Sequence, residues 1–212
     1  MQLRASGGRA AQRAAAKAAA GAKPVASRQG DRKPAGGPED ADLTSLIKAR
    51  VRDVPDYPQP GIVFKDITPL LGDGPALQAV VSGLASGHGP IDKVAGIEAR
   101  GFILAASAAC QLGVGFVPVR KQGRLPGPTY AQSYQLEYGT ATLEIHQDAF
   151  RPGERVLIVD DVLATGGTAV AATSLIRRAG AEVAGVAVIL ELTFLGGRAK
   201  LGSEPLRVLL AV

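Results

Sequence analysis

The stretch Val156-Leu157-Ile158-Val159-Asp160-Asp161-Val162-Leu163-Ala164-Thr165-Gly166-Gly167-Thr168 decides how we interpret the rest of the chain. Its four consecutive branched apolar residues predict a central parallel strand that is buried on both faces. Two carboxylates follow where we expect that strand to end. A glycine turn comes next, and the residues from Ala169 onward have the composition of a helix. This order of strand, acidic pair, turn and helix predicts an α/β fold.

The turn has the features of a phosphate site. Its glycines allow a tight bend with the amide N–H groups pointing inward, and Thr165 and Thr168 add hydroxyls at the N-terminus of the predicted helix. Asp160 and Asp161 cannot serve the same anion, because carboxylates repel phosphate. They suit a neighbouring cis-diol, with a magnesium ion nearby. The stretch therefore predicts a pocket for ribose 5-phosphate. It is neither a Walker A loop nor a dinucleotide fingerprint, since the residues and glycine spacing of both motifs are missing.

This stretch resembles the phosphoribosyl-pyrophosphate signature of type I phosphoribosyltransferases. The resemblance implies an α/β fold with a doubly wound, mainly parallel sheet, a small hood and a flexible lid loop. It also implies that the ribose-phosphate site consists of Asp160, Asp161, Ala164, Thr165, Gly166, Gly167 and Thr168.

A proline-rich segment precedes the predicted sheet. The prolines of residues 57–60 exclude regular structure, and residues 62–71 are expected to form a brief extended piece. By composition, Phe64 fits either the core or a stacking face for a flat ligand. Residues 57–71 resemble the base-binding hood of adenine phosphoribosyltransferases. The resemblance implies that Phe64 stacks on adenine, that the backbone of Val63 and Lys65 reads the edge of the base, and that Val162 closes its other face.

A second anion site is expected where the strand at residues 93–97 ends in Glu98-Ala99-Arg100-Gly101, before an Ala-rich helix at 103–111. Gly101 would let the backbone approach an anion closely, and Arg100 offers a planar fork for phosphate oxygens. An ion-paired turn explains these residues equally well. They are similar to the pyrophosphate loop of the family, which implies that all four bind pyrophosphate and that the Glu98–Ala99 peptide is cis.

Residues 120–130 combine cations, glycines and prolines, which predicts a basic, non-helical loop. A solvated surface hairpin would have the same composition. The segment resembles the flexible catalytic lid of adenine phosphoribosyltransferases, continuing through residues 133–139. The resemblance implies that Lys121 and Arg124 reach pyrophosphate oxygens, that Glu137 approaches the imidazole edge of the purine, and that Tyr138 helps to seal the closed lid.

The reaction implied is the transfer of phosphoribose from phosphoribosyl pyrophosphate to adenine, giving AMP and pyrophosphate, with Mg2+ bound to the substrate rather than to the protein. The catalytic residues would be Glu137, Arg100, Asp160 and Asp161. Two alternatives stay open. The chain could be a transcription regulator that senses phosphoribosyl pyrophosphate, although no helix-turn-helix is visible. The base could instead be xanthine, guanine or hypoxanthine, for which a side-chain donor to the 6-oxo group would be expected.

Charge divides the chain into two parts. Residues 1–33 contain eight lysines and arginines against one acid, so this segment has a net charge of +7, while the whole chain is at +5. The remainder is therefore mildly acidic. With almost nothing to bury, residues 1–40 are predicted to be a disordered, basic Ala/Gly-rich leader: a solvated appendage, a transit peptide or a weak polyanion-binding tail. Residues 41–212 would form the phosphoribosyltransferase domain, with its hood at about 41–72 and its lid at about 120–140.

The number of cysteines and the length of the apolar runs limit where in the cell the protein can reside. The single cysteine, Cys110, excludes an internal disulfide framework and fits a reducing compartment, so we expect a cytoplasmic protein. Its Ala-rich apolar surroundings predict a packed position. No apolar run reaches the ~18 residues of a membrane span. The family resemblance implies a homodimer, with neither a membrane nor a specific nucleic acid as partner.

Overall fold

The computed structural model describes residues 40–135 and 139–212. The leader predicted at residues 1–40 lies outside the described residues except for its last residue, and so do Glu137 and Tyr138 of the predicted lid.

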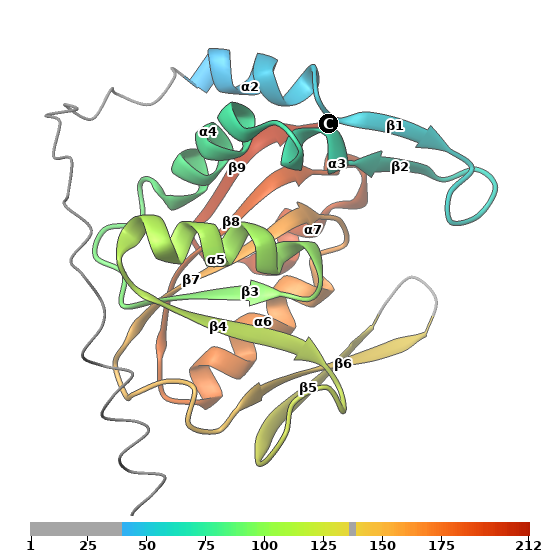
Figure 1. The fold of residues 1–212 in the computed structure, drawn as a ribbon. Coiled ribbons are helices and arrows are strands. Elements are labelled where there is room, and N and C mark those ends of the chain that lie inside the picture. Colours follow the sequence, from blue (N-terminus) through green and yellow to red (C-terminus); the bar gives the residue numbers. More distant parts are fainter. Residues whose placement is uncertain (1–39, 136–138) are drawn as a thin grey trace, which may run out of the picture. The chain divides into compact units, whose positions relative to one another are not determined.

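A seven-stranded sheet with the order β5-β6-β4-β3-β7-β8-β9 organises the described chain (Figure 1). Neighbouring strands from β4 to β9 in this order run parallel, whereas β5 and β6 form an antiparallel extension at one edge. The mainly parallel sheet is therefore confirmed. The strands are β3 (Lys93–Ile97), β4 (Gly115–Lys121), β5 (Thr129–Gln135), β6 (Thr140–His146), β7 (Arg155–Leu163), β8 (Glu182–Glu191) and β9 (Leu206–Ala211).

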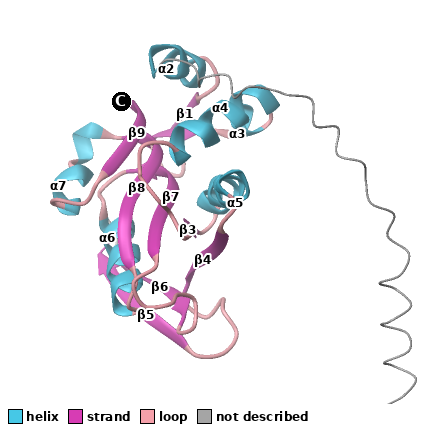
Figure 2. Cartoon of the chain, turned by 90° about the vertical axis from the view of Figure 1, so that its left-hand side faces the viewer, coloured by secondary structure: helices cyan, strands magenta, loops and turns pink. Residues whose placement is uncertain are grey.

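Helices cover both faces of this sheet. Figure 2 shows α4 and α5 on one side and α6 on the other, which is the doubly wound arrangement expected from the sequence. A separate antiparallel pair, β1 (Arg52–Pro55) and β2 (Val63–Asp66), forms the hood. The helices are α2 (Asp40–Lys48), α3 (Thr68–Leu71), α4 (Gly74–Ala85), α5 (Arg100–Leu112), α6 (Gly167–Arg178), the 3-10 turn η1 (Thr193–Leu195) and α7 (Gly197–Leu201). Within the described ranges, no helix has the length and apolarity needed to cross a membrane.

The strand β7 is central because both of its faces are apolar. Leu157 and Val159 pack in the core beneath α4 and α5, and Val156 and Ile158 pack in the core beneath α6. All four side chains are fully buried. A strand that is apolar at every position can be stable only between two layers of helices. The prediction from residues 156–159 is thus confirmed.

Several element boundaries differ from the sequence-based expectations. The strand β7 does not end before the acidic pair but continues through it to Leu163, because β8 remains paired alongside. Helix α5 begins at Arg100 rather than at residue 103. Residues 68–71 are helical rather than extended, since Pro69 occupies a first-turn position where its missing N–H costs nothing.

The basic segment and the cysteine also differ from expectation. Residues 120 and 121 belong to β4 and residues 129 and 130 to β5, so the loop between them is shorter than predicted. Cys110 is exposed on α5, contrary to the packed position that its apolar neighbours suggested.

A glycine on β3 sets the distance between the sheet and α5. A Cβ atom at Gly96 would lie 2.6 Å from the Ala105 Cβ and 3.0 Å from the Gly101 carbonyl oxygen. We expect Gly96→Ala to lower the unfolding free energy by about 1–3 kcal/mol, because the helix must shift. Chemical denaturation measures this. The matched control is Gly115→Ala on β4, where the nearest atom is 3.7 Å away; equal stability of the two variants would contradict the packing argument.

Candidate active site

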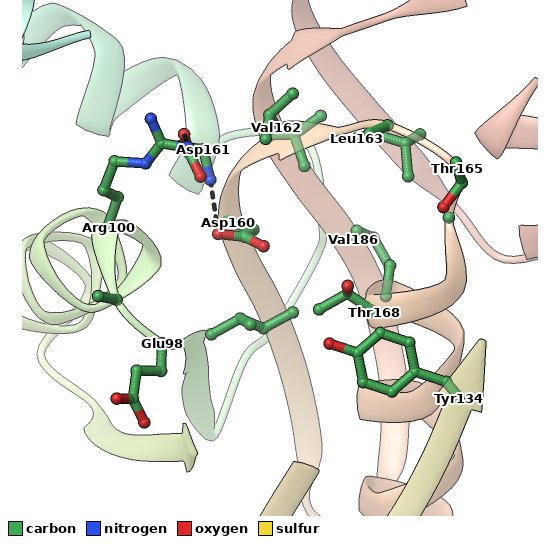
Figure 3. Close-up of a pocket in the computed structure, with 16 residues that line it drawn as sticks. Glu98, Arg100, Tyr134, Asp160, Asp161, Val162, Leu163, Thr165, Thr168 and Val186 are labelled. Carbon is green, nitrogen blue, oxygen red and sulfur yellow. Dashed lines mark hydrogen bonds and ion pairs between the residues drawn. The ribbon is translucent and has the colours of Figure 1, made fainter. Parts of the chain in front are cut away.

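A cavity of about 490 Å³ opens where β3 and β7 end and where α5 and α6 begin (Figure 3). This is the edge of a parallel sheet at which ligands of α/β proteins bind. Its lining brings together residues from the predicted pyrophosphate, base and ribose-phosphate sites. They are Glu98, Ala99, Arg100, Asp160, Asp161, Val162, Ala164, Thr165, Gly166 and Thr168.

The acidic pair forms one wall of the cavity. The Asp161 amide donates a 2.9 Å hydrogen bond to Asp160 Oδ1, and Asp161 itself is only 4% exposed. The Asp160 side chain keeps some exposed surface but is surrounded by protein atoms. This burial raises the pKa of Asp160 well above its usual range, and the neighbouring charge of Asp161 raises it further. Ionisation of both carboxylates of the pair at once is therefore unfavourable.

Arg100 supplies the balancing charge. Its Nη2 lies 2.8 Å from Asp161 Oδ2, although this contact lacks the alignment of a hydrogen bond, so Oδ2 has no hydrogen-bond partner among the described residues. Burial raises the pKa of Asp161, and the charge of Arg100 opposes that rise. The guanidinium also covers the Phe64 ring, with 4.9 Å between its carbon and the ring centroid. Arg100 thus joins the acidic pair to the hood.

Gly101 has a packing role that the sequence did not reveal. A Cβ there would lie 2.8 Å from Asp160 Oδ1 and 3.0 Å from the Val159 carbonyl oxygen. Its missing side chain lets the first turn of α5 approach β7 and brings Arg100 next to Asp161. Gly101 does not line the cavity.

Residues 164–168, the predicted phosphate loop, depend on glycine for their conformation. Gly166 has a positive φ of 79°, and a Cβ there would lie 2.5 Å from the Gly197 carbonyl oxygen. A Cβ at Gly197 would lie 2.1 Å from the Ala164 carbonyl oxygen. Among the described residues, no side chain caps the N-terminus of α6. Its first N–H groups therefore lack a side-chain partner, and the phosphate site assigned to them from the sequence stays a prediction.

Glu98 is held by the end of β4. Its Oε2 accepts hydrogen bonds from Arg120 Nε and from the Lys121 amide, both at 3.1 Å. Desolvation opposes the ionisation of Glu98, but these hydrogen bonds and the two positive charges lower its pKa overall. The Glu98–Ala99 peptide is cis, as the family resemblance implied. The carboxylate is thus engaged, which leaves the backbone of this turn to face an anion.

The other predicted residues lie outside the cavity lining. Lys121 and Arg124 are exposed, and the Arg124 carbonyl accepts a 2.9 Å hydrogen bond from Arg120. Val63 is 50% exposed in the hood, and Lys65 Nζ is paired with Asp53 at 2.7 Å. Gly167 does not line the cavity either, because it faces β5.

Two residues that belong to the site were not identified from the sequence. Gly197 supports the phosphate loop from α7, and its place in a glycine pair at 196–197 was the one available signal. Tyr134 lines the cavity from β5. Residues 133–139 belong to the predicted lid, but no role was predicted for Tyr134 itself. An edge strand reaches the loop only through the tertiary arrangement.

The described residues contain no group of three or more His, Cys, Asp or Glu side chains arranged to hold a metal. Asp160 and Asp161 are the carboxylates that line the cavity besides the engaged Glu98. Such a pair fits a magnesium ion that arrives with most of its oxygen ligands supplied by phosphates and water.

The raised pKa of Asp160 has a measurable consequence for stability. The pKa of Asp160 is higher in the folded than in the unfolded protein, so ionisation of Asp160 lowers the free energy of unfolding. This loss of stability is complete above the folded-state pKa and disappears as the pH falls to the unfolded-state pKa. Asp160→Asn removes this cost and keeps the Oδ1 acceptor. We expect the variant to melt higher than the parent at pH 8, by about 2–4 °C per kcal/mol relieved, with the difference shrinking toward pH 5.

Asp161→Asn is the matched control for this measurement by thermal melting between pH 5 and 8. The pKa of Asp161 is raised as well, so this change also relieves part of the cost, but it leaves Arg100 without its carboxylate and its gain should be smaller. A higher melting temperature for Asp161→Asn than for Asp160→Asn at pH 8 would contradict the assignment of the unfavourable charge to Asp160.

Comparison with known proteins agrees with this geometry. The phosphoribosyl transferase domain family matches residues 71–200. An adenine phosphoribosyltransferase from Acidothermus cellulolyticus is 59% identical over 174 residues, covering 81% of this chain and 98% of the relative. The crystal structure of the enzyme from Rhodothermus marinus superposes with a TM-score of 0.77 at 52% identity, covering 81% and 99% of the two chains.

A further solved structure shows what one relative binds. The Saccharomyces cerevisiae adenine phosphoribosyltransferase, complexed with an imino-altritol bisphosphate and adenine, superposes with a TM-score of 0.75 at 36% identity, covering 80% of this chain and 99% of that one. Both the sequence identity and the shared fold extend over nearly the full length of these relatives. The chain therefore belongs to the phosphoribosyltransferase family and, within it, groups with the adenine phosphoribosyltransferases.

Proposed function

We propose that the chain catalyses a purine-salvage reaction, the transfer of phosphoribose from phosphoribosyl pyrophosphate to adenine, giving AMP and pyrophosphate. The observation that carries this proposal is the placement of a buried acidic pair beside an uncapped glycine loop in one cavity. Carboxylates suit the ribose diol and bare amides suit the phosphate. The complex of the yeast relative with adenine supports the choice of base.

The two ends of the sugar phosphate are held by different chemistry. The 5-phosphate lies against the amides of residues 164–168 and the hydroxyls of Thr165 and Thr168. The ribose hydroxyls donate to Asp160 and Asp161, whose negative charge also stabilises the cationic character that develops at the anomeric carbon. Because the pKa of Asp160 is raised, a hydrogen-bonded or cationic partner lowers the cost of its ionisation.

The base end requires Arg100 to move. A purine stacked on Phe64 and the Arg100 guanidinium, 4.9 Å from the ring centroid, compete for the same aromatic surface. Pyrophosphate can form well-aligned, charge-assisted hydrogen bonds with Arg100, whereas the Asp161 carboxylate is poorly aligned with it. We propose that the guanidinium leaves Phe64 for the pyrophosphate, and that adenine then stacks between Phe64 and Val162, with the backbone of Val63 and Lys65 reading its edge.

Charge stabilisation of the leaving group completes the reaction. Arg100, Lys121 and Arg124 bind pyrophosphate oxygens, together with the backbone of residues 98–101. Asp160 and Asp161 are the carboxylates that would help to hold a substrate-bound magnesium ion, which would supply further neutralisation of that charge. Glu137 is the proposed general base toward adenine and Tyr138 helps to exclude water. Both lie outside the described residues.

Quaternary structure and location belong to the same proposal. We propose a cytoplasmic homodimer. Exposed apolar side chains on α5 and at the start of β4, Ile103 at 46% and Phe116 at 36%, are of the kind that subunit interfaces cover.

The direct test is an assay of the purified protein with phosphoribosyl pyrophosphate, Mg2+ and each free purine in turn. AMP should form from adenine at least about 100-fold faster than nucleotides form from hypoxanthine, guanine or xanthine, because a site built around specific hydrogen bonds rejects a base that leaves them unmade. If an oxopurine nucleotide formed at a rate comparable to that of AMP, the proposal that adenine is the specific substrate would be wrong. Absence of every nucleotide would favour a sensor of phosphoribosyl pyrophosphate.

The stacking role of Phe64 gives a second test. Phe64→Ala removes about 1–3 kcal/mol of base stacking, which corresponds to roughly a 5- to 150-fold rise in KM for adenine. The KM for phosphoribosyl pyrophosphate should stay within about threefold, since Phe64 lies away from the phosphate loop. Phe194→Ala is the control, because this ring is 76% exposed outside the cavity lining. An unchanged KM for adenine in Phe64→Ala would exclude stacking on this ring.

A further inference from the structure

Tyr134 enters the active-site cavity from the edge of the sheet. It lies on β5, one residue before the end of that strand, and lines the cavity together with Thr165, Gly166 and Thr168. Figure 3 shows its ring beside Thr168, with the hydroxyl directed into the cavity. Among the described residues, no hydrogen-bond partner of this hydroxyl is found. A phenol in this position needs a polar partner in the cavity or water.

The ring is fixed against the phosphate loop. A Cβ at Gly167 would lie 2.9 Å from the Gln135 carbonyl oxygen and 3.2 Å from Tyr134 Cδ2. The first turn of α6 and the end of β5 are therefore in direct contact, and only glycine at residue 167 permits it. The register places Tyr134 opposite Ala141 on β6, which holds the strand in place from its other side. Tyr134 is thus positioned by packing rather than by a ligand.

The phosphate loop itself is poor in positive charge. Residues 164–168 contain no cation, and Arg100, which is paired with Asp161, is the cationic side chain among the lining residues. A phosphate bound here depends on neutral donors: amide groups, threonine hydroxyls and any further hydroxyl within reach. Each hydrogen bond from a neutral donor to a charged oxygen is therefore a large share of the binding energy.

We propose that Tyr134 is a substrate-binding residue that donates its phenolic hydrogen to the 5-phosphate of the phosphoribosyl group. It completes the phosphate site from β5, beside the first turn of α6. This inference rests on the proposed function, because it assumes that the loop holds the 5-phosphate. It assigns to the β5 strand a direct contact with substrate.

The test compares Tyr134→Phe with Tyr130→Phe. Tyr130 lies on the same strand and the same face, four residues earlier, but its ring packs beneath Arg178 at 4.9 Å and does not line the cavity. Each change deletes one hydroxyl and keeps the ring. Tyr134→Phe should raise KM for phosphoribosyl pyrophosphate about 10-fold or more and leave kcat within about threefold, as expected for loss of uniform binding. Tyr130→Phe should change neither.

Product inhibition separates a phosphate contact from a structural effect. The inhibition constant of AMP should rise in Tyr134→Phe by about the same factor as KM, whereas that of adenosine, which lacks the phosphate, should stay as in the parent. Equal effects on AMP and adenosine, a fall in kcat without a change in KM, or unchanged AMP inhibition would each overturn the inference while the proposed function stands.

Binding of ribose 5-phosphate keeps the two proposals distinguishable. If the parent protein forms no nucleotide, the proposed function fails, and calorimetric titration with ribose 5-phosphate still decides the role of Tyr134. About 10-fold weaker binding by Tyr134→Phe than by Tyr130→Phe supports the contact, and equal affinities overturn it.

Discussion

Two carboxylates, those of Asp160 and Asp161, lie near the end of the buried strand β7, and the single guanidinium of Arg100 lies beside them. The balance of charge is incomplete: Arg100 contacts Asp161 without hydrogen-bond alignment, and the pKa of Asp160 is raised by burial and by its neighbour. Such a cluster of incompletely paired charges is costly. Under the proposed function, a ligand that supplies hydroxyl donors and positive character would lower this cost.

Glycines make this cluster and its neighbouring loop possible. Gly101 lets α5 descend onto Asp160, Gly96 lets the same helix approach β3, and Gly166 and Gly197 let the phosphate loop pack on α7. At Gly96, Gly166 and Gly197 a Cβ would lie closer than 3.0 Å to a core or backbone atom, and at Gly101 it would lie 2.8 Å from the Asp160 carboxylate. The site is thus built by close approach of main chains, which exposes amides to a ligand and fixes the few charged side chains at short range.

Arg100 connects the two halves of the site. It extends from the first turn of α5, pairs with Asp161 on β7 and covers Phe64 in the hood. In the proposed function, the same guanidinium would therefore make room for the purine on Phe64 and bind the pyrophosphate leaving group. Tyr134 adds a comparable connection on the opposite side, where the edge strand β5 meets the phosphate loop. In the proposed function, substrate recognition would draw on both edges of the cavity, although the signature motif lies between them.

Residues 156–168 alone determined the central strand, the parallel sheet and the glycine turn before α6, because two-sided burial and a glycine turn before a helix are local patterns with few alternative structures. The family resemblance added the hood, the cis peptide and the choice of base. Tertiary structure decided where the acidic pair sits: pairing with β8 carries β7 through Asp160 and Asp161, which no local signal predicted. It also decided that Arg100 pairs with Asp161, that Gly101 serves packing, and that Tyr134 and Gly197 reach the loop. These contacts join residues far apart in the chain, and their geometry follows from how the layers pack rather than from any neighbouring residues.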